Sequence, residues 1–239
     1  RRRRDSSMEK QFLNFCTRLA PVAIVLYFMA MAQLRCDAIT PYNEIYDLLH
    51  RAVLPDLRSS RTWSTTTFFA SLVDIWVLCS YLSFILMCVF WLGSAARRRF
   101  AICLCALYIF RTLTLLATRY PQAVTTFVNP PYVAPNIGLS GFLVMIGARV
   151  SQLDYMFSGH TSVWMLATLF VCYYGSRRFA GWLYGLFNLA GVILLLCLRM
   201  HYTADVLIAV FLGTFVFYTY HLAIDYKFPW LRAFIKYID

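Results

Sequence analysis

The sequence predicts an all-α integral membrane protein with six transmembrane helices and both termini in the cytosol. Hydrophobic residues make up 61% of the 239 residues and charged residues only 14%, and the mean hydropathy is +0.62. A soluble domain carries roughly 25% charged residues. Because the apolar residues are also grouped in long runs, this composition excludes a soluble globular domain.

Six apolar runs reach or approach the roughly 20 residues that a membrane-spanning helix needs. They cover residues 12–34, 67–92, 100–119, 159–175, 179–198 and 203–223. A further apolar stretch at 137–146 is too short to span, so we expect an interfacial or re-entrant segment there. Residues 1–239 are therefore expected to form a single six-helix catalytic domain, with a basic cytosolic leader at 1–11 and a cytosolic tail at 224–239.

The positive charges indicate how the chain is oriented. With the N-terminus in the cytosol, the inside segments carry 13 Lys and Arg residues and the outside segments 7, as the positive-inside rule requires. These charges lie in short clusters between apolar runs and form no basic stripe, so nucleic acid is not expected as a partner. Seven of the eight cysteines fall inside apolar runs without metal-ligand spacing, so we expect neither a metal nor another cofactor.

Two short motifs contain two of the four histidines. The sequence Ser-Gly-His-Thr at 158–161 opens the fourth expected span, and His-Tyr-Thr-Ala-Asp at 201–205 lies between the fifth and the sixth. In the six-span topology both motifs face the same side of the membrane, lumenal or extracellular. Charged and ionisable residues in or beside spans are costly and usually functional, which favours a reactive site over an isolated buried histidine.

The residue types in these motifs indicate phosphoryl transfer. On a helix, His201 and Asp205 would share one face, where the carboxylate could orient the imidazole as a nucleophile. Ser158 is expected to cap the helix that carries His160, and a helix N-terminus favours phosphate. A nucleophilic histidine and a second histidine as proton donor could pass a phosphoryl group through a covalent intermediate, which indicates an enzyme acting on phosphate-bearing lipids.

Two arginines are weaker candidates for contacts with that phosphate. Arg111 lies within a span and needs an anion, which could be Asp74 or a substrate phosphate. Arg199 lies two residues before His201, where a phosphate contact and ordinary snorkelling to the interface are equally good explanations. The remaining histidines fit less well: His221 belongs at the cytosolic end of the last span, and His50 has no partner suggested by spacing.

Four motifs follow one another along the chain from about residue 54. They are Leu54-Pro55-Asp56; Arg98-Arg99 with Tyr108, Arg111, Thr114 and Pro121; Asp154 with Ser158-Gly159-His160-Thr161; and His201-Tyr202-Thr203 with Asp205, Val206, Phe217 and Tyr220-His221. In this order they resemble the sphingomyelin synthase family, which includes the inositol phosphorylceramide synthases and is related to the type-2 phosphatidic acid phosphatases. The family usually has Cys-Gly where this chain has Gln152-Leu153, and an aromatic residue in place of Val210.

The resemblance implies a reaction and roles for its residues. His201 would attack the phosphorus of a glycerophospholipid donor, Asp205 would orient His201, and His160 would protonate the departing diacylglycerol. His160 would then act as the base on the hydroxyl of the ceramide acceptor. The phosphate and headgroup would be contacted by Asp154, Ser158, Arg111, Arg199 and Tyr202.

The resemblance leaves several properties open. The headgroup could be phosphocholine, phosphoethanolamine or phosphoinositol, and the membrane that of the Golgi, the endoplasmic reticulum or the cell surface; whether the chain forms a homo-oligomer is also open. A lipid phosphate phosphatase is an alternative, although the Lys-x6-Arg-Pro motif of those enzymes is absent. A non-enzymatic membrane protein that binds or scrambles lipids is a second alternative.

Overall fold

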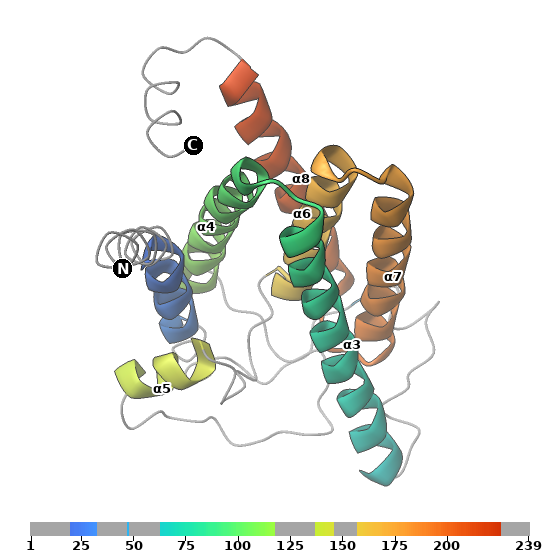
Figure 1. Ribbon diagram of the computed structural model, residues 1–239. Coiled ribbons are helices and arrows are strands. Elements are labelled where there is room, and N and C mark those ends of the chain that lie inside the picture. The colour runs from blue at the N-terminus through green and yellow to red at the C-terminus, as the bar shows by residue number, and fades with distance from the viewer. Residues whose placement is uncertain (1–19, 33–46, 48–62, 118–136, 146–156, 226–239) are drawn as a thin grey trace, which may run out of the picture.

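Every regular element in the described part of the chain is an α-helix. The computed structural model describes residues 20–32, 47, 63–117, 137–145 and 157–225 (Figure 1). The all-α class predicted from the sequence is confirmed for these residues. The helices are Ala20–Ala32, α3 (Trp63–Phe90), α4 (Ser94–Ala117), α5 (Ile137–Met145), α6 (Gly159–Tyr174), α7 (Arg178–Cys197) and α8 (Thr203–Asp225).

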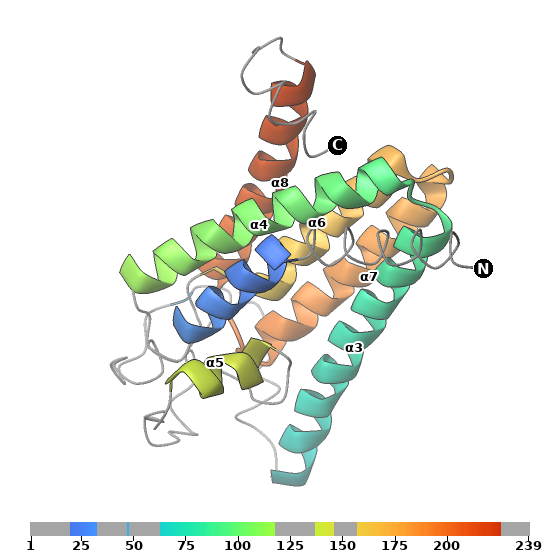
Figure 2. The ribbon, with the colours of Figure 1, turned by 60° about the vertical axis from the view of Figure 1, so that its left-hand side comes forward.

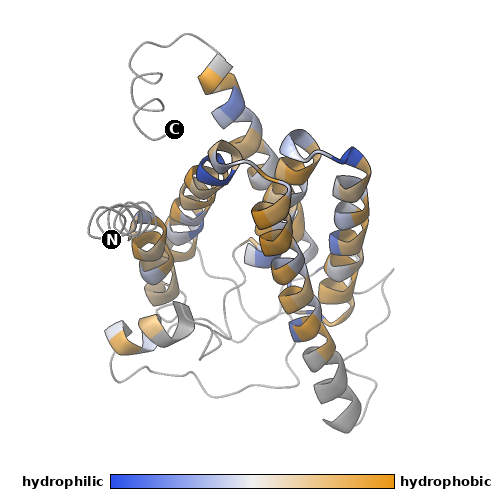
Figure 3. Ribbon diagram, in the orientation of Figure 1, coloured by the Kyte–Doolittle hydropathy of each residue, from blue (hydrophilic) through white to orange (hydrophobic). Residues whose placement is uncertain are grey.

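Four of these helices are long and apolar enough to cross a membrane. The spanning segments are Leu72–Phe90, Ser94–Ala117, Arg178–Cys197 and Thr203–Ile224, and their ribbons are largely hydrophobic (Figure 3). The 16-residue α6 and the Ala20–Ala32 helix are apolar but shorter. The structure therefore shows a multi-pass helical membrane protein, and α5, with nine residues, is as short as the sequence predicts.

Helix α6 occupies the centre of the bundle and packs against α3, α4, α7 and α8 (Figure 2). Its Phe170 side chain is fully buried and makes edge-on ring contacts with Phe100 of α4 and Phe217 of α8. Trp164 and Leu166 of the same helix are also buried. Because α6 touches helices on all sides, its first turn has a fixed position relative to the neighbouring helix ends.

Helices α3 and α7 pack closely around a small residue and a polar network. A Cβ atom at Gly191 would lie 2.7 Å from Nε1 of Trp76, so only glycine allows this approach. The Trp76 ring stacks on Phe187 with a centroid separation of 4.5 Å. Nearby, the buried Ser80 hydroxyl donates to Oδ1 of Asn188 at 2.6 Å. Such interhelical hydrogen bonds satisfy polar groups that lipid cannot solvate.

A second polar network joins α4, α6 and α8 where α6 ends. The guanidinium of Arg99 donates to the hydroxyl of Tyr174 at 3.2 Å, and this hydroxyl lies 2.6 Å from Nε2 of His221. Nδ1 of His221 lies 2.6 Å from the carbonyl oxygen of Phe217. His221 therefore lies at the opposite end of the bundle from His160, as the sequence predicts.

The short helix α5 lies against the Ala20–Ala32 helix. The Tyr27 hydroxyl donates to the Gly138 carbonyl at 3.2 Å, and a Cβ atom at Gly141 would lie 2.7 Å from Cγ of Met31. Ala32 also packs on Leu115 in the last turn of α4. These contacts place the two helices beside the end of α4, which is the end nearest to the candidate site (Figures 1 and 2).

Candidate active site

The two histidine motifs meet where α6 and α8 begin. The backbone N–H of Ser158 donates to the backbone carbonyl of Asp205 at 3.2 Å, which joins the residue before α6 to the first turn of α8. Ser158 and Asp205 are both completely buried. The expectation that the motifs containing His160 and His201 lie at one end of the bundle is confirmed.

At the start of α6, Ser158 is the N-cap residue that the sequence predicts. Its hydroxyl oxygen accepts from the backbone N–H of Thr161 at 3.3 Å and from the Thr161 hydroxyl at 3.0 Å. The cap satisfies one of the N–H groups that every helix leaves free at its first turn. His160 is half-buried in this turn, and its ring centroid lies 6.5 Å from Tyr81 and 6.1 Å from Trp164.

At the start of α8, Asp205 lies close to two groups of the preceding turn. Its Oδ2 atom accepts from the backbone N–H of Tyr202 at 3.1 Å and lies 3.7 Å from Nδ1 of His201. The carboxylate thus makes half of a capping box by reaching back to the residue before the helix. All three side chains are buried.

The contact between His201 and Asp205 arises differently from the sequence expectation. We expected both residues on one face of a helix, but α8 begins at Thr203 and His201 lies in the turn before it. The four-residue spacing still brings the imidazole to the carboxylate, because the turn folds back over the first turn of the helix.

Arg111 extends from α4 to the segment that precedes α6. Its buried guanidinium donates to the backbone carbonyl of Phe157 and lies over the Phe157 ring, 5.3 Å from Cζ to the centroid. A Cβ atom at Gly159 would lie 3.1 Å from Cζ of Arg111, so glycine provides the space for this approach. The structure therefore places a permanent positive charge beside the first turn of α6.

Asp74, one of the two anions suggested for Arg111, does not pair with it in the structure. The Asp74 side chain is exposed on α3 and makes no ion pair within the described residues. The sequence suggested Asp74 or a substrate phosphate as the anion for Arg111, whereas the acceptor observed in the structure is the backbone carbonyl of Phe157.

Both histidine motifs follow a residue with an unusual backbone conformation. Phe157 has φ of 36° and Arg199 has φ of 51°, and these are the non-glycine residues with positive φ in the described chain. This left-handed region is costly for residues with a Cβ atom and is enriched at functional sites. Phe157 directly precedes Ser158, and the half-buried Arg199 lies two residues before His201. A residue with a strained backbone conformation therefore lies just before each motif.

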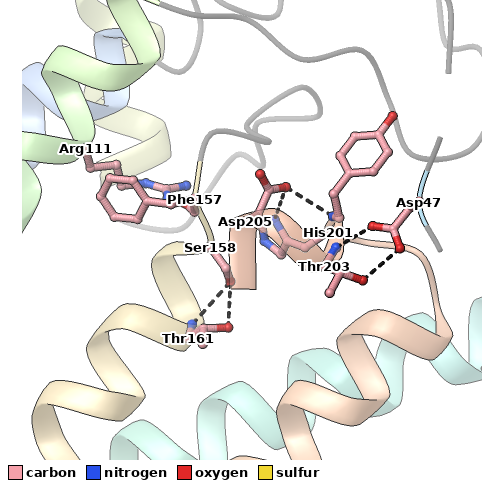
Figure 4. A network of polar contacts seen from close by, with 9 residues as sticks. Asp47, Arg111, Phe157, Ser158, Thr161, His201, Thr203 and Asp205 are labelled. Atoms are coloured by element: carbon pink, nitrogen blue, oxygen red, sulfur yellow. Dashed lines mark hydrogen bonds and ion pairs between the residues drawn. The ribbon is translucent and has the colours of Figure 1, made fainter. Parts of the chain in front are cut away.

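Asp47 is a residue of this region that the sequence analysis missed. Its Oδ2 accepts from the backbone N–H of Thr203 at 2.6 Å, and its Oδ1 accepts from the Thr203 hydroxyl at 2.8 Å (Figure 4). The carboxylate is buried and holds the first residue of α8. No sequence signal connects the two residues, because they are 156 positions apart.

Some predicted residues lie outside the described part of the chain. They include Asp154, proposed to contact the headgroup, and His50. Among the described residues, no group of three or more His, Cys, Asp or Glu side chains could hold a metal ion. Of the other predicted site residues, those that the structure brings to this end of the bundle are His160, His201, Asp205, Ser158, Arg111, Arg199 and Tyr202.

Comparison with known proteins identifies the class to which this part of the chain is related. Residues 153–222, from before α6 to near the end of α8, match the PAP2 superfamily C-terminal family. This segment carries both histidine motifs. The family resemblance predicted from the motifs is thereby confirmed for the segment that holds both histidine motifs.

The particular relatives are phosphatidylcholine:ceramide cholinephosphotransferases. The chain is 30% identical to enzyme 1 of Gallus gallus over 140 residues, 54% of this chain and 34% of the relative. It is 34% identical to enzyme 1 of Caenorhabditis elegans over 131 residues (48% and 28%), and 32% identical to enzyme 2 of Rattus norvegicus over 135 residues (51% and 36%). The chain thus spans about a third of the length of these relatives.

Removal of the Asp47 carboxylate is expected to loosen the start of α8. We predict that Asp47→Ala lowers the free energy of unfolding by about 2 kcal/mol, because two hydrogen bonds to a charged acceptor are lost. Thr203→Val removes only the hydroxyl bond and should cost less. Thermal unfolding of the purified protein in detergent measures both effects.

The double variant provides the control. Because the two side chains are in contact, Asp47→Ala combined with Thr203→Val should lose less stability than the sum of the two single losses, with a coupling of about 1 kcal/mol. Strictly additive losses would contradict the contact.

Proposed function

We propose that this protein is a sphingolipid synthase, which transfers a phospho-headgroup from a glycerophospholipid to ceramide and releases diacylglycerol. The observation that carries the proposal is the hydrogen bond from Ser158 to Asp205, because it places the motifs of His160 and His201 at one site. The relatives are named for transfer of phosphocholine from phosphatidylcholine to ceramide. Phosphocholine is therefore the headgroup that we expect first, with phosphoethanolamine and phosphoinositol as the alternatives.

In the first half of the proposed reaction, His201 is the nucleophile. Asp205 lies 3.7 Å from Nδ1 of His201, where its negative charge favours the tautomer with the proton on that nitrogen and leaves the Nε2 lone pair for attack. A bond forms between Nε2 and the donor phosphorus, and the bond from phosphorus to the diacylglycerol oxygen breaks. His160 donates a proton to that oxygen, so diacylglycerol leaves as a neutral alcohol.

In the second half, the same groups act in reverse order. The neutral His160 removes the proton from the primary hydroxyl of ceramide as its oxygen attacks the phosphohistidine. The bond between Nε2 of His201 and phosphorus breaks, and the headgroup phosphate is now esterified to ceramide. His160 ends protonated, ready for the next donor, so no proton is gained or lost over the cycle.

The phosphate carries negative charge throughout and needs positive partners. The buried Arg111 lies beside the first turn of α6, and we propose that its guanidinium stabilises the charge on the phosphoryl oxygens. Ser158 and the N–H groups of that turn add hydrogen-bond donors. Arg199, Tyr202 and Asp154 are proposed to contact the headgroup, Arg199 and Tyr202 from the turn that carries His201.

We further propose six membrane spans, with both termini in the cytosol and the site on the lumenal or extracellular face. The Ala20–Ala32 helix and α6 would supply the two spans beyond the four long helices. Exposed arginines lie at the end of the bundle opposite the site, which fits a cytosolic location for that end. The Golgi, the endoplasmic reticulum and the cell surface membrane are compatible with this orientation.

The reaction class can be tested with the purified protein. We expect incubation with phosphatidylcholine and ceramide to yield sphingomyelin and diacylglycerol in equal amounts, because one headgroup moves for each donor cleaved. Mass spectrometry of products from a mixture of donor phospholipids identifies the preferred headgroup. Release of free phosphate from phosphatidic acid, with no sphingolipid product, would instead establish the phosphatase alternative.

The proposed roles of the histidines predict different defects. His201→Gln should reduce transfer by at least about a thousandfold, since no covalent intermediate can form, and His160→Gln by about a hundredfold or more. The matched control is His221→Gln, which changes a histidine at the far end and should retain activity per folded molecule. Unchanged transfer by folded His201→Gln would favour the non-enzymatic alternative.

The proposed topology can be checked in cells. A glycosylation acceptor inserted in the segment 119–136 should be modified, because that segment is expected in the lumen, whereas the same insertion at Ser176 should not. Glycan addition is read as a shift in electrophoretic mobility that an endoglycosidase removes. The reverse pattern would show that the orientation is inverted.

A further inference from the structure

An apolar groove runs between α3 and α7 on the membrane-facing surface of the bundle. It has a volume of about 640 Å³, within the range of about 300–1,000 Å³ that is typical of sites for small ligands. Met87 and Tyr184 line it and are buried, so they form its floor. Its sides include the exposed apolar side chains of Leu86, Phe90 and Leu183. A groove of this kind on a membrane-spanning surface fits an acyl chain.

Three arginines lie at one end of this groove. Arg97 donates to the backbone carbonyl of Cys88 at 3.2 Å, which holds its guanidinium against the last turns of α3 beside Met87. Arg177 caps α7 and Arg178 begins it, two residues before Ala180, which lines the groove. In Figure 3, the starts of α4 and α7 are correspondingly the hydrophilic ends of their helices.

These arginines have no anionic partner within the described part of the chain. All three side chains are exposed, and none makes an ion pair there. Three acidic residues have side chains that the structure describes, and they lie elsewhere: Asp47 and Asp205 at the candidate active site, and the exposed Asp74 nearer the start of α3. An apolar groove that ends at three exposed cations is complementary to a lipid with an acyl chain and an anionic headgroup.

The groove is separate from the candidate active site. Helix α7 runs from Arg178 at the groove to Cys197 near the turn that carries His201. Its 20 residues span about 30 Å, roughly the thickness of the hydrocarbon core. A lipid bound with its phosphate at Arg178 therefore cannot present that phosphate to His201.

We propose that this groove is a second lipid site, which binds one anionic phospholipid with an acyl chain between α3 and α7 and its headgroup at Arg97, Arg177 and Arg178. The bound lipid is not a substrate but a constituent of the membrane leaflet at this end of the bundle. Anionic lipids are concentrated in the cytosolic leaflet, where the proposed topology places these arginines.

The test is native mass spectrometry of the full chain purified in detergent. The protein is titrated with dioleoylphosphatidylserine or dioleoylphosphatidylcholine, which carry identical chains. We expect one molecule of the serine lipid to be retained at about tenfold lower concentration than the choline lipid. The triple variant R97Q/R177Q/R178Q should lose this preference, and R97K/R177K/R178K, which conserves the charge, should keep it.

A second pair of variants tests the groove itself. Ala180→Trp fills the groove and should abolish retention of the serine lipid, whereas Leu189→Trp adds the same side chain to an exposed position of α7 outside the groove and should not. If Ala180→Trp does not fold, the glutamine and lysine variants of the three exposed arginines still test whether these residues bind the serine lipid.

Three results would overturn the proposal. They are equal retention of both lipids by the unmodified chain, an unchanged preference in the glutamine variant, and a dimer that forms through this face without lipid and disappears in Ala180→Trp. The measurement is binding and needs no turnover, so its outcome is independent of whether the protein transfers a headgroup.

Discussion

The arrangement of the site depends on how two backbone groups outside the helices are satisfied. Phe157 and Ser158, the two residues directly before α6, are not helical, yet both are fully buried, so their N–H and C=O groups need partners within the protein. The Ser158 N–H is satisfied by the carbonyl of Asp205, and the Phe157 carbonyl by the guanidinium of Arg111. These two hydrogen bonds join α6 to α8 and to α4. They therefore fix the position of His160 relative to the turn that contains His201.

The backbone and the side chain of Asp205 have different roles at the site. Its backbone carbonyl makes the link to Ser158, while its carboxylate accepts from Tyr202 and lies beside His201. The main-chain link is independent of the side chain, and only the carboxylate can set the tautomer of the imidazole. Arg111 likewise has two roles. Its guanidinium donates to the backbone carbonyl of Phe157, and it places a positive charge near the proposed phosphate position. The site is thus built from groups that each serve the fold and the proposed reaction.

The sequence predicted the helices well, because long apolar runs in lipid have few alternatives to a helix. It also predicted that both histidine motifs share one end of the bundle, which follows from the alternating direction of successive spans. The sequence did not predict contacts that involve backbone groups, or contacts between residues far apart along the chain. Arg111 donates to a backbone carbonyl, which no side-chain pattern reveals, and Asp47 meets Thr203 from 156 residues away. His201 contacts Asp205 as expected, but it lies in the turn before α8 and not on the helix. This turn follows Arg199, whose φ is positive.

The motifs that resemble the sphingomyelin synthases contain residues of two kinds. His160, His201 and Asp205 lie at the site, whereas Arg99 and His221 meet at Tyr174 at the opposite end. The second group joins the same three helices, α4, α6 and α8, that the Arg111 and Ser158 hydrogen bonds join at the site. These helices are therefore held at both ends, and α3 and α7 pack around them. Some motif positions thus hold helices together at the end of the bundle opposite the site, which is why the resemblance alone could not separate catalytic residues from architectural ones.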